Sequence, residues 1–143
     1  MLFEESGKTS KKWASDDLLI FKHSENSWVI SFRTRDILSK ARCDEMVSIF
    51  SCLIECIDFP CGIVFDFSCI EQLNEDEAGN FMAVSLPFQD CGCQVCLCCL
   101  NVQVLELFES QNLEGRFHFA AEQEDALFAL KFSSSSILEL GSR

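Results

Sequence analysis

The spacing of hydrophobic residues predicts two strands in the first quarter of the chain. Residues 18–21 form a short apolar run, and in residues 28–33 Trp28, Ile30 and Phe32 alternate with Val29, Ser31 and Arg33. Alternation with a period of two is typical of a strand that buries one face. The polar residues 23–27 separate the two runs, and a short polar connection of this kind favours a hairpin. We therefore predict two antiparallel strands between residues 18 and 33.

The pattern then changes to a helical period. Between residues 43 and 57 apolar side chains recur mostly at spacings of three and four, while acidic and hydroxyl side chains occupy the other side. This spacing predicts an amphipathic helix, which Pro60 and Gly62 are expected to end. Residues 62–67 are apolar and rich in β-branched and aromatic side chains, which predicts a strand buried on both faces.

A second helix is predicted to begin at residue 74. Asn is a favoured N-cap residue, and Glu77 stands three positions later, as in a capping box. Apolar residues at helical spacing follow, including Ala78 and Phe81. Pro87 is expected to end or kink this helix, because proline lacks a backbone N–H.

The rest of the chain continues the alternation of strands and helices. We predict a strand over 94–100, a short helix near 104–108, a strand over 117–119 and a last helix from about 122 to 131. The order is therefore ββαβαβαβα. Strands that alternate with single helices imply right-handed crossovers and a largely parallel sheet, with the first hairpin as an antiparallel edge.

The domain organisation follows from composition. With 143 residues, 48% of them hydrophobic, the chain is expected to form one core. Residues 1–15 contain few apolar side chains and are predicted to be a flexible N-terminal tail, with Trp13 docking at its end. The domain is predicted over residues 16–132. Residues 133–143 begin with four serines and are predicted to be a C-terminal tail.

Charge and cysteine content restrict the partners and the compartment. The formal net charge of −12 disfavours nucleic acid and anionic membranes as partners and favours a basic protein surface. The amino-terminal residues lack the pattern of a secretory signal, and no apolar run is long enough to span a bilayer. We therefore expect a cytoplasmic protein whose ten cysteines are mostly reduced thiols.

A cluster of cysteines suggests zinc, but its spacing argues against that interpretation. The cluster consists of Cys91, Cys93, Cys96, Cys98 and Cys99. Cys93 and Cys96 have the spacing of half a zinc site, but no second half is present. Strand alternation would point Cys96 and Cys98 one way and Cys99 the other. We therefore expect buried core thiols, with no metal and no cofactor.

No arrangement of residues indicates an enzyme. His118 stands between two Phe residues on a predicted strand, and the sequence supplies no nucleophile or carboxylate to work with it. No Gly-rich phosphate loop and no nucleophile elbow is found. We expect His118 to be structural or surface-facing, and we expect no catalytic residue.

Residues 63–79, IVFDFSCIEQLNEDEAG, resemble the STAS family (sulfate transporter and anti-sigma factor antagonist). The family has an apolar strand that ends in Asp-Leu-Ser, then a short loop, then Asp-Ser-Ser-Gly at the start of a helix. Residues 66–68 match the strand end. Asn74 stands where the family has Asp, Glu75 and Asp76 replace its two hydroxyl residues, and Glu77 replaces its Gly. The resemblance covers residues 18–130 and implies an α/β, STAS-like fold with a mixed, mostly parallel sheet and about four helices.

The resemblance implies a regulatory function. In the bacterial branch, the domain binds an anti-sigma factor that is also a serine kinase, and phosphorylation at the start of the second helix breaks the complex. Glu75 and Asp76 carry no hydroxyl, so we expect no phosphorylation at the family position; Ser68 is a second candidate acceptor. The expected partner-binding surface comprises Ser68, Cys69, Ile70, Asn74, Glu75, Asp76 and Glu77, with Cys69 and Ile70 as its apolar contacts.

Three interpretations of the acidic residues remain open. In one, Glu75 and Asp76 imitate the phosphorylated state permanently, because two carboxylates carry about the charge of one phosphate. In another, the domain is a scaffold or adaptor subunit of a larger complex, without phosphorylation control. In the third, residues 74–77 only cap the helix, because acidic side chains are favoured in a first turn.

Overall fold

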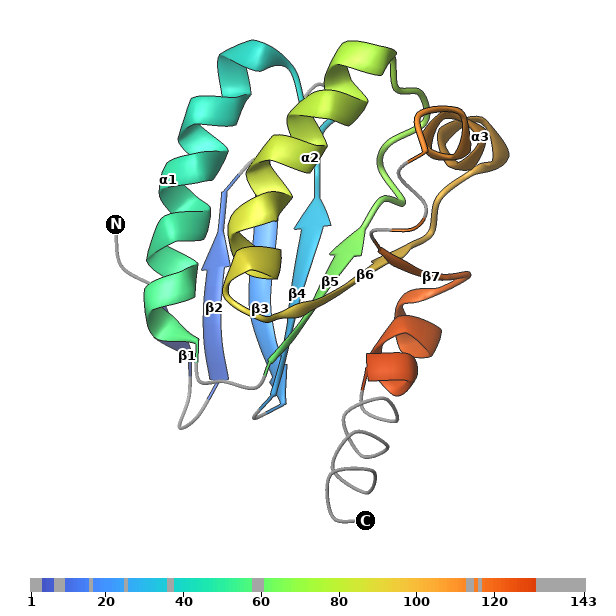
Figure 1. Ribbon diagram of the computed structural model, residues 1–143. Coiled ribbons are helices and arrows are strands. Elements are labelled where there is room, and N and C mark those ends of the chain that lie inside the picture. Colours follow the sequence, from blue (N-terminus) through green and yellow to red (C-terminus); the bar gives the residue numbers. More distant parts are fainter. Residues whose placement is uncertain are drawn as a thin grey trace.

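The computed structural model of the chain describes residues 4–6, 10–15, 17–24, 26–35, 38–57, 61–112, 115 and 117–130, with side chains from residue 13 onward. One mixed sheet is covered on one face by three helices, and the chain ends its described part in a further helical segment (Figure 1). The elements are β1 (Glu4–Ser6), β2 (Ser10–Ala14), β3 (Leu18–Ser24), β4 (Ser27–Phe32), α1 (Lys40–Cys56), β5 (Gly62–Asp66), α2 (Glu75–Asp90), β6 (Gln94–Cys98), α3 (Val102–Ser110), β7 (His118–Ala120) and the helical residues 123–130.

The sheet has seven strands in the order in which they occur along the chain. Strands β1 to β4 pair antiparallel, and β4 to β7 pair parallel. One row across the parallel part joins Val29, Val64, Cys96 and His118. The β3–β4 hairpin, the parallel crossovers and the α/β class are therefore as the sequence predicted, but the hairpin is not the antiparallel edge, because β2 and β1 lie outside it.

The amino-terminal segment differs from the prediction of a flexible tail. Residues 10–14 form β2, which pairs with β3, so that Trp13 lies opposite Ile20. Trp13 is partly buried and packs against the core, as predicted. A strand that hydrogen-bonds to the edge of a sheet needs few apolar side chains of its own, and for this reason composition alone missed it. Residues 133–143, predicted as a tail, lie outside the described residues.

Helix α2 also differs from its predicted end. It continues through Pro87 to Asp90 rather than ending at the proline. Pro87 stands in the last turn, where its missing N–H removes one helical bond, and its carbonyl still accepts from the N–H of Cys91 at 3.1 Å. Phe88, directly after the proline, is fully buried, and its packing favours the helical path.

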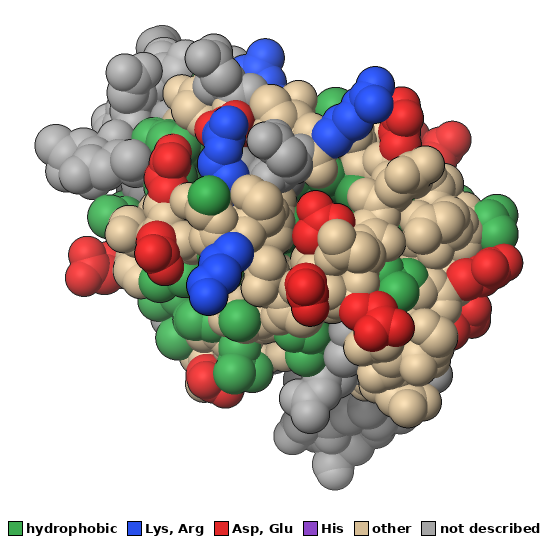
Figure 2. Space-filling model, turned by 90° about the horizontal axis from the view of Figure 1, so that it is seen from above, with side chains coloured by type: hydrophobic (Ala, Val, Ile, Leu, Met, Phe, Trp, Pro, Cys, Tyr) green, Lys and Arg blue, Asp and Glu red, His purple; other side chains and the backbone are tan. Residues whose placement is uncertain are grey.

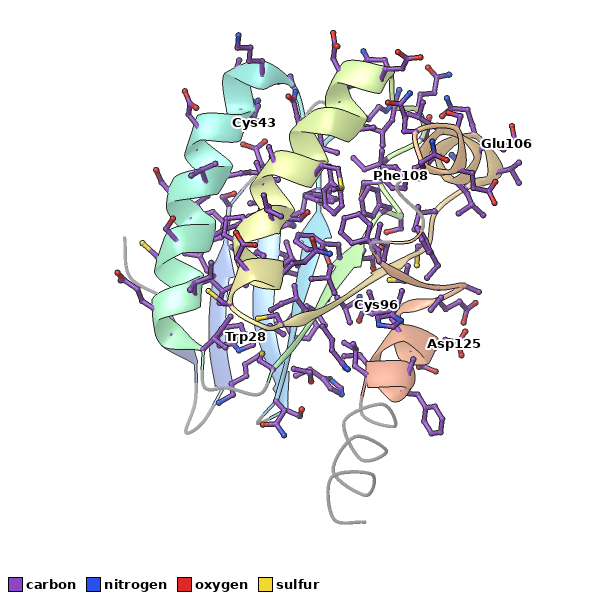
Figure 3. All side chains as sticks on the ribbon, in the orientation of Figure 1. Trp28, Cys43, Cys96, Glu106, Phe108 and Asp125 are labelled. Atoms are coloured by element: carbon purple, nitrogen blue, oxygen red, sulfur yellow. The ribbon has the colours of Figure 1, made fainter. Side chains whose placement is uncertain are left out.

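Hydrophobic clusters lie on both faces of the sheet, and they differ in size. Between the sheet and α1, α2 and α3 lies a large cluster rich in phenylalanine, in which Phe81 contacts the rings of five other Phe residues. Figure 3 shows this density of side chains, with Phe108 of α3 among them. The other face carries a smaller cluster beneath residues 123–130: Val29, Val64, Cys96, Cys98, Ala126 and Leu130.

Gly62 allows the last helical segment to lie close to the sheet. A Cβ atom at this position would lie 2.8 Å from Cδ1 of Leu130, which is closer than van der Waals contact permits. The start of β5 therefore favours glycine for packing against Leu130, rather than for a turn. Among the described residues, none of the helices is both long and apolar enough to cross a membrane.

Candidate functional site

The amino end of α2 is closed by a complete capping box, as the sequence predicted. The Asn74 side chain accepts from the N–H of Glu77 at 2.8 Å, and the Glu77 carboxylate accepts from the N–H of Asn74 at 3.0 Å. These two bonds satisfy two backbone donors that the helix itself leaves free. Asn74 and Glu77 therefore have a structural role that needs no partner.

Glu75 and Asp76 are not used by the cap. Both side chains are exposed, and within the described part of the chain neither makes a hydrogen bond or an ion pair. The helix dipole favours their negative charge at this end, but no contact fixes their position. The four residues that sequence analysis treated as one unit are thus two pairs, of which only Glu75 and Asp76 are available to a partner.

The loop between β5 and α2 is held in a defined shape by hydrogen bonds. The N–H of Ser68 donates to the carboxylate of Asp66 at 2.8 Å, which turns the chain at the end of β5. From α3, the Asn101 amide donates to the carbonyl of Glu71 at 2.6 Å. Gln103 bonds both backbone groups of Leu73 at 3.3 Å. The loop therefore offers a fixed surface.

The structure corrects one apolar contact in the predicted surface. Ile70 is 2% exposed and belongs to the core, so it cannot contact a partner. Ser68 and Cys69 are exposed, as the prediction required. Val102, the first residue of α3, is 71% exposed, and its neighbours Asn101 and Gln103 bond the same loop. Val102 was not among the predicted surface residues, because the apolar spacing indicates a helix that starts only at residue 104, two residues later than α3 does.

We call the exposed residues of this region the acidic surface: Ser68, Cys69, Asn74, Glu75, Asp76 and Val102. It lies at the carboxyl end of the parallel strands, where α1 and α2 both begin (Figure 1). Figure 2 looks onto this end and shows acidic side chains spread over it, with basic side chains between them.

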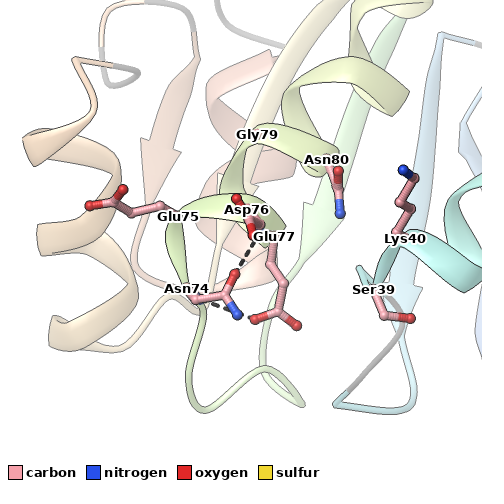
Figure 4. Close-up of a pocket in the computed structure, with 8 residues that line it drawn as sticks. All are labelled: Ser39, Lys40, Asn74, Glu75, Asp76, Glu77, Gly79 and Asn80. Atoms are coloured by element: carbon pink, nitrogen blue, oxygen red, sulfur yellow. Dashed lines mark hydrogen bonds between the residues drawn. The ribbon is translucent and has the colours of Figure 1, made fainter.

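A shallow cavity of about 650 Å³ lies between the amino ends of α1 and α2 (Figure 4). The amide of Asn80 in α2 donates to the carbonyl of Leu38 at 2.9 Å and ties the two helix starts together. Lys40 provides the basic side chain of the lining and lies at the start of α1, on the other side of the cavity from the start of α2. The lining residues are Ser39, Lys40, Asn74, Glu75, Asp76, Glu77, Gly79 and Asn80.

The cysteines are divided between the two faces of the sheet. Cys93 belongs to the large core cluster and Cys96 to the small one, so the two cysteines that have the spacing of half a zinc site lie on opposite faces of the sheet. A hydrogen bond with Cys61, together with burial, raises the pKa of the Cys93 thiol. Burial raises the pKa of Cys96 to about 11. At neutral pH these thiols are protonated, which agrees with the expected role of core side chains.

The prediction that Cys99 points away from Cys98 is wrong. Cys99 has φ of 61°, a left-handed conformation that ends the alternation of β6. Its side chain packs against the same small cluster that contains Cys98. The structure places His118 exposed on β7, in line with the expectation of a surface-facing residue.

Comparisons by sequence find no relatives. No protein-family model matches the chain, and no curated protein sequence matches it.

Comparisons of structure do find the fold. A serine-to-glutamate variant of RsbS from Moorella thermoacetica superposes with a TM-score of 0.67 at 18% identity, covering 82% of this chain and 97% of that one. An anti-sigma-factor antagonist (STAS) domain protein from Planctomyces limnophilus gives a TM-score of 0.65 at 14% identity, covering 80% and 98%. A chain of the stressosome, described as a signal integration and transduction hub, gives 0.63 at 18% identity, covering 80% and 97%. The chain therefore has the fold of STAS domains.

Proposed function

We propose that the chain is a non-enzymatic, regulatory STAS-type domain that binds another protein through the acidic surface. The observation that carries this proposal is the pair Glu75 and Asp76, which are exposed at a helix start whose cap is already complete without them. Gln103 bonds the loop that precedes them, and its neighbour Val102 is exposed, so that an apolar side chain is available next to this loop in addition to the charge. Protein interfaces use this combination for specificity and for affinity.

The partner we propose is an anti-sigma factor of the serine-kinase type, which presents a basic patch to Glu75 and Asp76. The name of the Planctomyces neighbour, an anti-sigma-factor antagonist, supports this class of partner. The net charge of −12 supports a basic contact surface. Because the two residues at the family's phosphorylation position are carboxylates, we propose that their charge is permanent and that no kinase switches it.

Affinity capture from the native cell tests this proposal. The full-length chain is compared with the double variant Glu75→Arg, Asp76→Arg and with the matched control Glu124→Arg, Asp125→Arg. The control changes the same charge near the start of the helical segment on the other face of the sheet, where Asp125 is exposed (Figure 3). We expect the first variant to lose a kinase-type partner that the wild type and the control both retain. Equal capture by all three proteins would refute the proposed surface.

Phosphosite mapping of the captured chain provides an independent check. We expect no phosphate on this protein in cells, because Glu75 and Asp76 cannot form a phosphoester. Ser68 is exposed in the same loop, so a phosphate found there would contradict permanent charge and would identify Ser68 as the switch.

A second candidate function is that of a scaffold subunit in a larger assembly. The similarity to a chain of the stressosome favours it. Size-exclusion chromatography of the native complex separates the two candidates. A stable, stoichiometric assembly in which the chain contacts copies of other STAS domains would support the scaffold. A one-to-one complex with a kinase would support the regulatory antagonist.

A further inference from the structure

Three metal-ligating side chains meet at the carboxyl ends of β5 and β6. Asp66 ends β5, Cys98 ends β6 in register with it, and Cys99 follows. One carboxylate oxygen and the two Sγ atoms all lie within 4.8 Å of one another. Among the described residues, these three form the one group of His, Cys, Asp or Glu side chains that lie close enough together to share an ion.

The conformation of Cys99 creates this cluster. Its φ of 61° is a left-handed value that costs a non-glycine residue roughly 1–2 kcal/mol. The bond from the N–H of Cys99 to the carbonyl of Ala121, at 3.2 Å, holds the backbone there. As a result, two adjacent thiols lie on the same side of the sheet, whereas strand alternation would place them on opposite sides.

The carboxylate of Asp66 is held in a fixed orientation, and both of its oxygen atoms can still coordinate a cation. Oδ1 accepts from the N–H of Ser68 at 2.8 Å, and Oδ2 accepts from the side-chain amide of Gln123 at 2.9 Å. Each carboxylate oxygen has two lone pairs, so each retains one for a cation. Hydrogen bonds that orient a ligand in this way are typical of protein metal sites.

The charge of the cluster also favours a cation. Asp66 is only 8% exposed, and within the described part of the chain no basic side chain forms an ion pair with it. A buried carboxylate without a charged partner is costly, and a divalent cation held by Asp66 and the two neighbouring sulfur atoms would supply that partner.

We propose that Asp66, Cys98 and Cys99 form a zinc site, with a water molecule as the fourth ligand. Two thiolates and one carboxylate are ligands that zinc accepts in a tetrahedral arrangement. Binding releases two protons, one from each thiol, to solvent, and no electron is transferred. Through Gln123 the ion would connect β5 and β6 to the helical residues 123–130. This site is independent of the protein-binding function proposed above.

The test uses reduced, metal-free, full-length protein titrated with Co²⁺, which reports thiolate ligands by a charge-transfer absorption, followed by displacement with Zn²⁺. We expect one Co²⁺ per chain, displaced by one Zn²⁺. The variants are Cys99→Ser and Asp66→Asn, of which the first removes a half-buried thiol with little change in volume. Each should lower the affinity for Zn²⁺ at least tenfold.

Two matched controls locate the site. Cys69→Ser, Cys91→Ser removes two exposed thiols and should bind Co²⁺ like the wild type. Cys93→Ser disrupts the other close pair, formed with Cys61, and should also leave binding unchanged. An absence of the charge-transfer absorption in the folded wild type would overturn the proposal. So would unchanged affinity in Cys99→Ser, or a loss of binding in either control.

Discussion

The two faces of the sheet are filled with different side chains. The face under α1, α2 and α3 is packed with phenylalanine rings, with Phe81 at their centre. We call the face under residues 123–130 the thin face, because its buried cluster has few members. Among its side chains are the thiols of Cys96 and Cys98. Most of the buried phenylalanines thus lie on one face, whereas buried cysteines occur on both: Cys61 and Cys93 on the aromatic face, Cys96 and Cys98 on the other.

This difference has a functional consequence. The aromatic face anchors α2 and so fixes the position of the acidic surface at its amino end. The thin face brings the last helical segment close to the sheet at Gly62 and brings thiols close to Asp66. One face therefore supports a docking surface and the other a candidate ion site, and variants can test each face separately.

Removal of the central ring should have the largest effect on stability. Phe81→Ala should lower the free energy of unfolding by about 3–5 kcal/mol, because a buried aromatic side chain is replaced by a cavity. Cys96→Ala on the thin face should cost roughly 1 kcal/mol, because far less apolar volume is lost. Urea denaturation of both variants measures the difference. Similar losses would show that the two faces contribute equally.

Replacement of glycine by alanine should lower the stability of the protein at Gly62 in the sheet and raise it at Gly79 in α2. Gly62→Ala should destabilise the protein by about 1–3 kcal/mol, because the new methyl group would overlap Leu130. Gly79→Ala in α2 meets nothing within 4 Å and should stabilise it by about 0.5–1 kcal/mol, because alanine favours a helix. Melting temperatures of the two variants provide the test, and the same sign for both would count against the close approach at Gly62.

The N-cap side chains of the two helices that flank the cavity should contribute different amounts to the free energy of unfolding. Asn74→Ala should cost about 1 kcal/mol, because it breaks the capping box. Ser39→Ala should cost less, because the Ser39 side chain makes no cap hydrogen bond at the start of α1. Denaturant midpoints compare the two, and a larger loss for Ser39→Ala would contradict the hydrogen bonding described above.

These comparisons also show which features the sequence could predict. The β3–β4 hairpin, the order of elements after it and the capping box depend on local patterns, and all three were predicted, whereas β1 and β2 were not. Cys99 and Ile70 were misjudged because tertiary contacts determine their conformation. A bond to Ala121 holds the backbone of Cys99 in the left-handed region. The turn after Phe67 directs Ile70 into the core. The spacing of apolar residues along the sequence does not indicate either contact.

The smallest effect on stability is expected at Glu75 and Asp76, whose side chains make no hydrogen bond or ion pair within the described part of the chain. Glu75→Gln and Asp76→Asn should each cost roughly 0.3–1 kcal/mol at low salt, through the helix dipole alone, and less at high salt. Thermal unfolding at two salt concentrations measures this. A loss as large as that of Asn74→Ala that persists at high salt would indicate that these carboxylates are part of the cap, and would weaken the proposal that they are free to bind a partner.

The most direct test of the central claim is hydrogen–deuterium exchange of the chain with and without the captured partner. The account predicts slower exchange over residues 68–76 and at the start of α3, and unchanged exchange over residues 123–130. Protection confined to residues 123–130, with residues 68–76 unaffected, would contradict it.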